Sequence, residues 1–407
     1  MTSTTSSSPQ AVSAAAPAPQ STASSAASTS ASMLPSIPDI LYGTAWKDTR
    51  TTTLVFTAIT AGFRGIDTAG QRKHYREELV GQALHQLEEA GVARREEVWL
   101  QTKFTSKDGQ DLSGPVPYDP RWPVRKQIRH SAFASLRNLH VSDRWDKAEL
   151  LEAAKQAAGL AQTSGASAAN KGKGRSVDYT QSALGRSSAN DEGEQHPSGL
   201  PDFAKFRPIG AISPDGKTRP WLDSYLLHSP LRSLEETLQA WQEMELLVQE
   251  GWVRHIGFSN VYDSRIWNAL LQSINIRPLA LQNRWHSSSG HDVSLLSTLS
   301  PILSPNDSEG HAIHYQPFWT LTGNPALLRS EPVVRAAIAH DWTPAQVVYK
   351  FVNQGMGIQG LRCCVLTGTT DEKHMRQAVQ VVNNRHGESH LLTVGEVNEI
   401  RKQVYGE

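Results

Sequence analysis

Cysteine is nearly absent from this 407-residue chain, which holds only Cys363 and Cys364. Two adjacent cysteines cannot build a disulfide framework, and no second pair is present to complete a zinc site. We therefore expect two buried strand residues in a protein of a reducing compartment. No apolar run of about eighteen residues occurs either, which excludes a membrane-spanning helix.

The chain also lacks a net charge, because 40 Lys and Arg balance 40 Asp and Glu. No block of like charge stands out, which argues against nucleic acid or an anionic membrane as the main partner. A small, neutral or weakly charged ligand fits this balance better. No basic residue precedes Lys47, which disfavours a transit peptide, and no apolar core suggests a secretory signal. These absences predict a cytoplasmic protein.

Residues 1–34 lack charge and consist largely of Ser, Ala, Thr and Pro. A segment with so few large apolar side chains cannot offset the entropy lost on ordering. We expect a disordered tail over residues 1–34 and a folded domain over residues 35–407.

From about residue 38, short β-rich phrases alternate with amphipathic helical patterns. Thr343 with Gln346, and Thr393 with Glu396, are capping boxes that mark the starts of two late helices. The expected strands are the first phrase PDILYGTAW and then FRGID, VWLQTK, DSYLLH, RHIGFS, PLALQN, AIHYQP and CCVLTG. Eight such units predict parallel pairing, right-handed crossovers and a closed (β/α)8 TIM barrel. An open doubly wound sheet is the alternative, but no GxGxxG loop follows the first strand.

One segment, residues 142–220, interrupts this alternation between the third helix and the fourth strand. An αβ connection is normally a handful of residues, so about eighty residues form an insertion. The part SDRWDKAELLEAAKQAAGLAQ can form a helix, whereas the rest is of low complexity. Because a helix-to-strand link lies on the N-terminal face of a barrel, we expect a surface excursion away from the catalytic end. A docking module for a partner is the less favoured interpretation.

Reactive side chains gather at the ends of three strands. Asp67 ends the second strand, Lys103 the third and His228 the fourth, and Tyr75 follows at the start of the next helix. Each has an ordinary structural explanation taken singly. Together they predict a catalytic rim, because burying them unpaired costs several kcal/mol each. A nearby ammonium is expected to lower the pKa of the phenol, which could then deliver a proton to a carbonyl oxygen.

The sequence resembles the aldo-keto reductases and looks like a diverged, fungal-type member of that family. The phrases that carry the resemblance occur in family order over residues 38–140 and 221–402. They are YGTAW, GFRGIDTA, Y-x-x-E at Tyr75 to Glu78, VG at Val80 and Gly81, TKF, DSYLLHSP, HIGFSN, LQNRW, HYQPFW and TPAQVVYKFVNQG. The resemblance implies hydride transfer from a nicotinamide cofactor to an aldehyde or ketone.

The resemblance also implies roles for individual residues. Tyr75 would be the general acid, Lys103 and Asp67 would tune it, and His228 would orient the carbonyl group. The implied cofactor residues are Ser259, Asn260 and Gln282 at the nicotinamide amide, Tyr315 stacked under the ring, Gln316 beside it, and Thr369 and His374 at the adenosine end. The implied substrate residues are Trp46, Trp285, Phe318 and Trp319, which suggest bulky or aromatic carbonyls. No metal is implied.

Two departures from the family pattern affect these assignments. The family usually places its tyrosine five residues after the aspartate, where this chain has Arg72, so three extra residues precede Tyr75. After the eighth strand, LTGT replaces a lysine-containing phrase, and His374 stands where an arginine is usual. NADP(H) is therefore favoured as the cofactor, with NAD(H) as the alternative.

The sequence predicts a monomeric NAD(P)H-dependent carbonyl reductase. A second hypothesis is a non-catalytic NADP(H)-binding regulatory barrel that contacts a protein partner through residues 142–220. A third, a metal-dependent barrel hydrolase, is disfavoured because the strand ends lack several His and Asp ligands.

Overall fold

The computed structural model describes residues 36–159, 208–299, 313–383 and 391–406, so the tail predicted over residues 1–34 lies outside the described residues. The strands are β1 (Ile40–Gly43), β2 (Gly65–Asp67), β3 (Trp99–Phe104), β4 (Leu222–Leu227), β5 (Val253–Ser259), β6 (Ala280–Gln282), β7 (His314–Tyr315), β8 (Arg362–Cys363) and β9 (Val365–Thr367). All of them pair in parallel, in the order β8-β7-β6-β5-β4-β3-β2-β1-β9.

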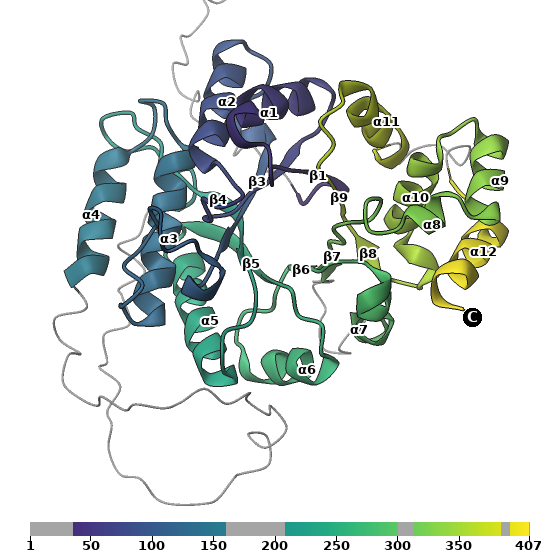
Figure 1. Ribbon diagram of the computed structural model, residues 1–407. Helices are drawn as coiled ribbons and strands as arrows, with labels where there is room; N and C mark the ends of the chain where they lie inside the picture. The colour runs from purple at the N-terminus through teal and green to yellow at the C-terminus, as the bar shows by residue number, and fades with distance from the viewer. Residues whose placement is uncertain (1–35, 160–207, 300–312, 384–390, 407) are drawn as a thin grey trace, which may run out of the picture. The chain divides into compact units, whose positions relative to one another are not determined.

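The sheet closes because β8 and β9 together occupy the position of the eighth strand of the barrel. Only Cys364 separates them, and its N–H donates to the Tyr315 carbonyl of β7, while the next N–H, of Val365, donates to Asp39 before β1. β8 pairs with β7, and β9 pairs with β1. The eight strand positions therefore form the closed (β/α)8 barrel predicted from the sequence, with helices around the strands (Figure 1). Both cysteines are buried in this eighth strand position, as expected.

The helices follow the predicted periodicity. They are α1 (Thr51–Thr60), α2 (Glu77–Glu89), α3 (Val124–Leu139), α4 (Lys147–Gly159), α5 (Leu234–Gln249), α6 (Ser264–Ser273), α7 (Val293–Leu299), α8 (Pro325–Leu328), α9 (Glu331–His340), α10 (Pro344–Asn353), α11 (Glu372–Val382) and α12 (Val394–Tyr405). Both predicted capping boxes are present, Thr343 with Gln346 and Thr393 with Glu396. Among the described helices, none is long and apolar enough to span a bilayer.

Apolar helix residues and strand residues form one hydrophobic core, which fixes where the strand ends lie. In α1, for example, Leu54, Val55, Ala58 and Ile59 recur at helical spacing and are all buried. Burying one such side chain stabilises the fold by roughly 1.5–3 kcal/mol. The core therefore holds the carboxyl ends of the strands at one rim, where barrel enzymes place their reactive groups.

The described ends of the insertion pack against the opposite end of the barrel. Trp145 is buried and meets Trp221 edge to face at 5.7 Å. Arg219 is fully buried, with its guanidinium 3.8 Å from the ring centroid of Trp252 and its Nε 3.3 Å from Glu149. Because Trp221 and Trp252 immediately precede β4 and β5, this packing lies at the N-terminal strand ends, away from the rim. Deleting all of residues 142–220 would therefore remove side chains of the barrel core, not only a surface excursion.

Candidate active site

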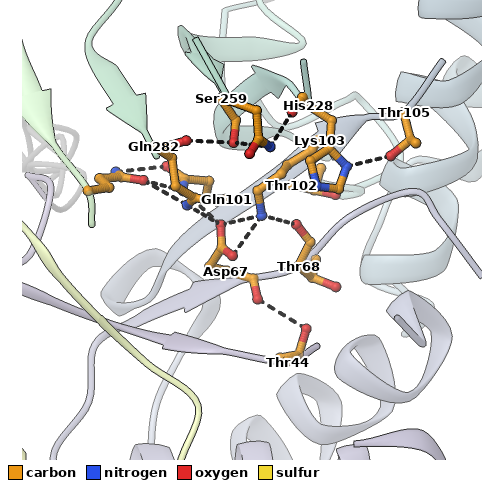
Figure 2. A network of polar contacts seen from close by, with 12 residues as sticks. Thr44, Asp67, Thr68, Gln101, Thr102, Lys103, Thr105, His228, Ser259 and Gln282 are labelled. Carbon is orange, nitrogen blue, oxygen red and sulfur yellow. Dashed lines mark hydrogen bonds and ion pairs between the residues drawn. The ribbon is translucent and has the colours of Figure 1, made fainter. Parts of the chain in front are cut away.

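An ion pair lies inside the barrel at the rim. Lys103 Nζ donates to both carboxylate oxygens of Asp67 at 2.7 Å and to the Thr68 carbonyl at 2.9 Å (Figure 2). Both side chains are almost completely buried, so the desolvation cost is offset only because every donor of the ammonium has a partner. Burial lowers the pKa of Lys103, and the adjacent Asp67 acts in the opposite direction.

Three glutamines surround this ion pair. Gln101 Nε2 and Gln282 Nε2 donate to Asp67 Oδ1 at 2.8 and 3.1 Å, and both also donate to Gln316 Oε1. Gln101 lies two residues before Lys103 on β3, and alternate strand residues share a face, so both reach the barrel interior. Gln101 was not predicted as a site residue, although its spacing from Lys103 carries that signal. The network fixes the carboxylate beneath the ammonium.

Tyr75 lies within reach of both Lys103 and His228. The Lys103 ammonium is 5.5 Å from the centroid of the Tyr75 ring, and the Tyr75 and His228 ring centroids are 6.2 Å apart. No hydrogen bond joins the Tyr75 hydroxyl to any other residue of the described chain. The structure thus brings together all four residues of the predicted tetrad, Asp67, Tyr75, Lys103 and His228.

The expected pKa of Tyr75 needs a correction. The sequence suggested that Lys103 would lower it, but burial raises the pKa of Tyr75, and the Asp67 carboxylate raises it further. The physical reason is that a buried phenolate loses its hydration, and the nearby Asp67 carboxylate repels the negative charge that it would carry. Tyr75 therefore remains protonated across the neutral range.

His228 is neutral for a related reason. Burial, together with the charge of Lys103, lowers the pKa of His228 to about 3. Its Nδ1 lies 2.6 Å from Thr105 Oγ1, and its carbonyl accepts a hydrogen bond from Asn260 Nδ2 (Figure 2). A neutral imidazole held on one nitrogen can offer the other to a ligand.

The predicted nicotinamide residues only partly converge. Ser259, Asn260 and Gln282 lie together, since Ser259 Oγ and Asn260 N both donate to the Gln282 carbonyl. Tyr315 differs, because its side chain is fully buried and its hydroxyl donates to Asp292 Oδ2 at 2.8 Å. Its neighbour Gln316 faces the barrel interior instead. In this structure Tyr315 is thus not exposed to stack against a ligand.

The two residues predicted to bind the adenosine part of the cofactor, Thr369 and His374, line one groove. Thr369 and His374 border a cavity of about 320 Å³ between α10 and the start of α11. The other lining residues are mostly apolar or neutral: Leu321, Leu328, Thr343, Pro344, Ala345, Gln346, Tyr349, Gln377 and Ala378. A mostly apolar groove with a few polar groups at its edge suits the flat ring of a heterocycle.

Lys47 is a further candidate that was not predicted. It follows Trp46 at the end of β1, is buried, and donates to the carbonyl of Gly368 after β9. Burial lowers the pKa of Lys47, and the neighbouring Arg50 lowers it further. No carboxylate among the described residues pairs with this amine, so it is suited to an anion at the rim.

The four predicted substrate residues divide into two groups. Trp46 and Trp319 are 72% and 50% exposed, and both have left-handed backbones with φ near 61° and 63°. Such strain in bulky residues is concentrated at functional sites. Phe318 is partly buried beneath Arg284. Trp285, in contrast, is fully buried against His291, and so it does not reach the rim.

These features define a (β/α)8 barrel with an acid–amine–phenol–imidazole site at its C-terminal rim. Residues 218–296 match the model of the aldo/keto reductase family. Comparison with curated proteins gives no significant match.

Solved structures show the same fold over most of the chain. The aldose reductase from Schistosoma japonicum has a TM-score of 0.55 at 18% identity, covering 92% of this chain and 90% of that one. An aldo-keto reductase from a Medee basin deep-sea metagenome library also gives 0.55, at 16% identity and with 92% and 93% coverage. A Bombyx mori aldo-keto reductase in complex with NADP gives 0.53, at 16% identity and with 90% and 89% coverage. The match to the family's model thus covers residues 218–296, and the solved structures share the fold of the chain.

Proposed function

We propose that this protein is an NAD(P)H-dependent oxidoreductase that reduces an aldehyde or ketone to an alcohol, with Tyr75 as the general acid. The observation that carries the proposal is the closeness of Tyr75 to both the Asp67–Lys103 pair and a neutral His228. This combination is difficult to explain structurally, because the Tyr75 hydroxyl has no hydrogen-bond partner in the described chain. It is explained if a carbonyl oxygen binds there.

The chain's own residues suffice for orientation and proton transfer. Thr105 would donate to His228 Nδ1, which leaves the imidazole proton on Nε2 to hold the carbonyl oxygen. As negative charge develops on that oxygen, it becomes more basic than a phenolate, so Tyr75 can donate its proton despite its raised pKa. The Lys103 ammonium, which Asp67 holds in place, would then stabilise the phenolate that forms.

The residues fit the adenosine and pyrophosphate parts of a nicotinamide dinucleotide better than its nicotinamide ring. The groove at Thr369 and His374 would take the adenosine part, and Lys47 the pyrophosphate. Ser259, Asn260 and Gln282 would bind the carboxamide. Tyr315 would stack on the ring only after leaving Asp292. When bound, the cofactor supplies the hydride.

The preference between NADP(H) and NAD(H) depends on which side chain of the groove can hold the 2′-phosphate. Arg376 is held by Glu372 at 2.6 Å, so exposed His374 is the nearest candidate for a 2′-phosphate inside the groove. NADP(H) is favoured, since NADP and NADPH accompany two of the solved aldo-keto reductases. We expect His374→Arg to tighten NADPH binding roughly three- to tenfold, because a guanidinium binds phosphate through charged hydrogen bonds.

Quenching of protein fluorescence by NADPH and NADH measures this effect in the wild type and the variant. NADH, which lacks the 2′-phosphate, is the matched control and should bind both proteins equally. An equal gain for both cofactors would place His374 away from the phosphate. If neither NADPH nor NADH bound the wild type, the proposed function would fail.

A further inference from the structure

A polar pocket lies beside the loop that carries Tyr75. Its volume is about 350 Å³, and it lies between the loop that joins β2 to α2 and the loop that follows β3. The lining residues are Arg72, Lys73, Arg76, Gln110, Asp111, Gly114 and Pro115. Lys73 and Arg76 flank His74 and Tyr75 in the sequence, so the pocket and the catalytic phenol share one loop. We call these seven residues the basic pocket.

The two loops are fastened to each other, so the basic pocket exists before any ligand binds. Gln71 Nε2 donates to the Gly109 carbonyl at 2.6 Å, and Gln110 Nε2 donates to the Gly70 carbonyl at 2.8 Å. These reciprocal bonds hold the walls of the pocket at a fixed separation. Preorganisation of this kind lowers the entropic cost of binding.

Positive charge dominates the lining. Arg72 pairs with Glu78 at 2.9 Å, and Arg76 Nη2 pairs with Asp48 at 3.0 Å, while Arg76 Nη1 donates to the carbonyls of Arg72 and Tyr75. Neither acidic partner lines the basic pocket. Lys73 forms no hydrogen bond or ion pair with another described residue. Its ammonium is therefore available to an anion.

One carboxylate, Asp111, also lines the basic pocket, and it is occupied by its own loop. It accepts hydrogen bonds from the Ser113 hydroxyl and backbone N–H at 2.6 and 3.1 Å. These bonds lower the pKa of Asp111, and Lys73 adds to the effect. Lys73 also contributes, after burial, to the lowered pKa of His74 next to Tyr75. Its charge therefore acts on both the pocket and the catalytic loop.

Two of the lining residues lie in the stretch where the chain departs from the family's usual spacing. Three extra residues separate Asp67 from Tyr75, and Arg72 and Lys73 lie between these two positions.

We propose that the basic pocket binds an anionic group of the carbonyl substrate, and that the preferred substrates are aldehydes or ketones that carry a carboxylate. This inference rests on the proposed reductase function. The anion would lie beside the loop that carries Tyr75, so its binding would also help to position the carbonyl group. The cofactor's phosphates are the competing source of negative charge, and the experiment below distinguishes the two.

The test compares 4-carboxybenzaldehyde with its neutral near-isostere 4-formylbenzamide. The wild type should reduce the carboxylate with a KM about tenfold lower and a similar kcat, because several cations act on one anion. Lys73→Ala should raise the KM for the carboxylate about fivefold and leave the KM for the amide unchanged. Lys107→Ala removes an equally exposed lysine from the neighbouring loop, outside the basic pocket, and should change neither value.

Equal KM values for both aldehydes in the wild type would overturn the inference while leaving the reductase function intact. A rise in the KM for NADPH in Lys73→Ala, with no change for the carboxylate aldehyde, would assign the pocket to the cofactor and also overturn it. If neither aldehyde is reduced, the proposed function fails, and the inference that rests on it fails too.

Discussion

Replacing Tyr75 by phenylalanine should lower kcat for aldehyde reduction by at least about 10²-fold, because general acid catalysis by a positioned group typically contributes 10²–10⁴-fold. The substitution removes one hydroxyl that has no hydrogen-bond partner in the described chain, so the fold should be unaffected. Cofactor affinity should also be unchanged, since the proposed dinucleotide residues lie elsewhere on the rim. Steady-state kinetics and fluorescence titration measure the two effects separately.

Tyr225→Phe is the matched control for this experiment. Tyr225 is a buried tyrosine of β4 whose hydroxyl lies 3.4 Å from the Ile128 carbonyl and close to Ser131, away from the ion pair. Its kcat should remain within about twofold of the wild type, as expected for a substitution outside the reacting groups. Undiminished turnover in Tyr75→Phe would remove the acid assignment and leave the site without a proton donor.

Lys103→Met should be the most damaging substitution, because it affects both stability and catalysis. Removing one partner of a buried ion pair costs about 3–5 kcal/mol, since the other charge remains buried. Here Asp67 would keep the amide donors of Gln101 and Gln282 but lose the two bonds of 2.7 Å from the ammonium. The free energy of unfolding in urea should fall by about this amount, and turnover should be lost.

The double variant Asp67→Asn/Lys103→Met separates the two effects. It removes both charges, so most of the lost stability should return, because a neutral pair carries no desolvation cost of an isolated ion. Turnover should stay absent, since the phenolate of Tyr75 would have no cation to stabilise it. If the double variant regained activity, the ion pair would serve only the fold.

The sequence was informative wherever one local signal decided the structure. Helical periodicity and capping boxes predicted α1, α10 and α12, and the alternation of strands and helices predicted the barrel. The tetrad followed from position, since the carboxyl ends of neighbouring parallel strands share a rim. Residues 1–34 and 160–207 lie outside the described residues, so the predicted tail and most of the low-complexity insertion stay predictions.

The sequence was less informative where orientation depends on the assembled barrel. β7 has only two residues, so its pattern could not tell whether Tyr315 or Gln316 faces the interior. Trp285 follows a strand end, yet the chain turns it into the core. The pKa of Tyr75 was misjudged because the sequence does not show that the phenol is buried close to the Asp67 carboxylate.

The central claim is that the rim of this barrel directs a hydride to a carbonyl carbon while Tyr75 protonates the oxygen. Its most direct test is to incubate the purified protein with 4-formylbenzamide and NADPH deuterated at both C4 positions of the nicotinamide, and to examine the alcohol by NMR. We predict one deuterium on the carbinol carbon in the wild-type product, and at least about 10²-fold less product with Tyr75→Phe. An alcohol without deuterium, or no alcohol from a wild type that binds the cofactor, would contradict the account.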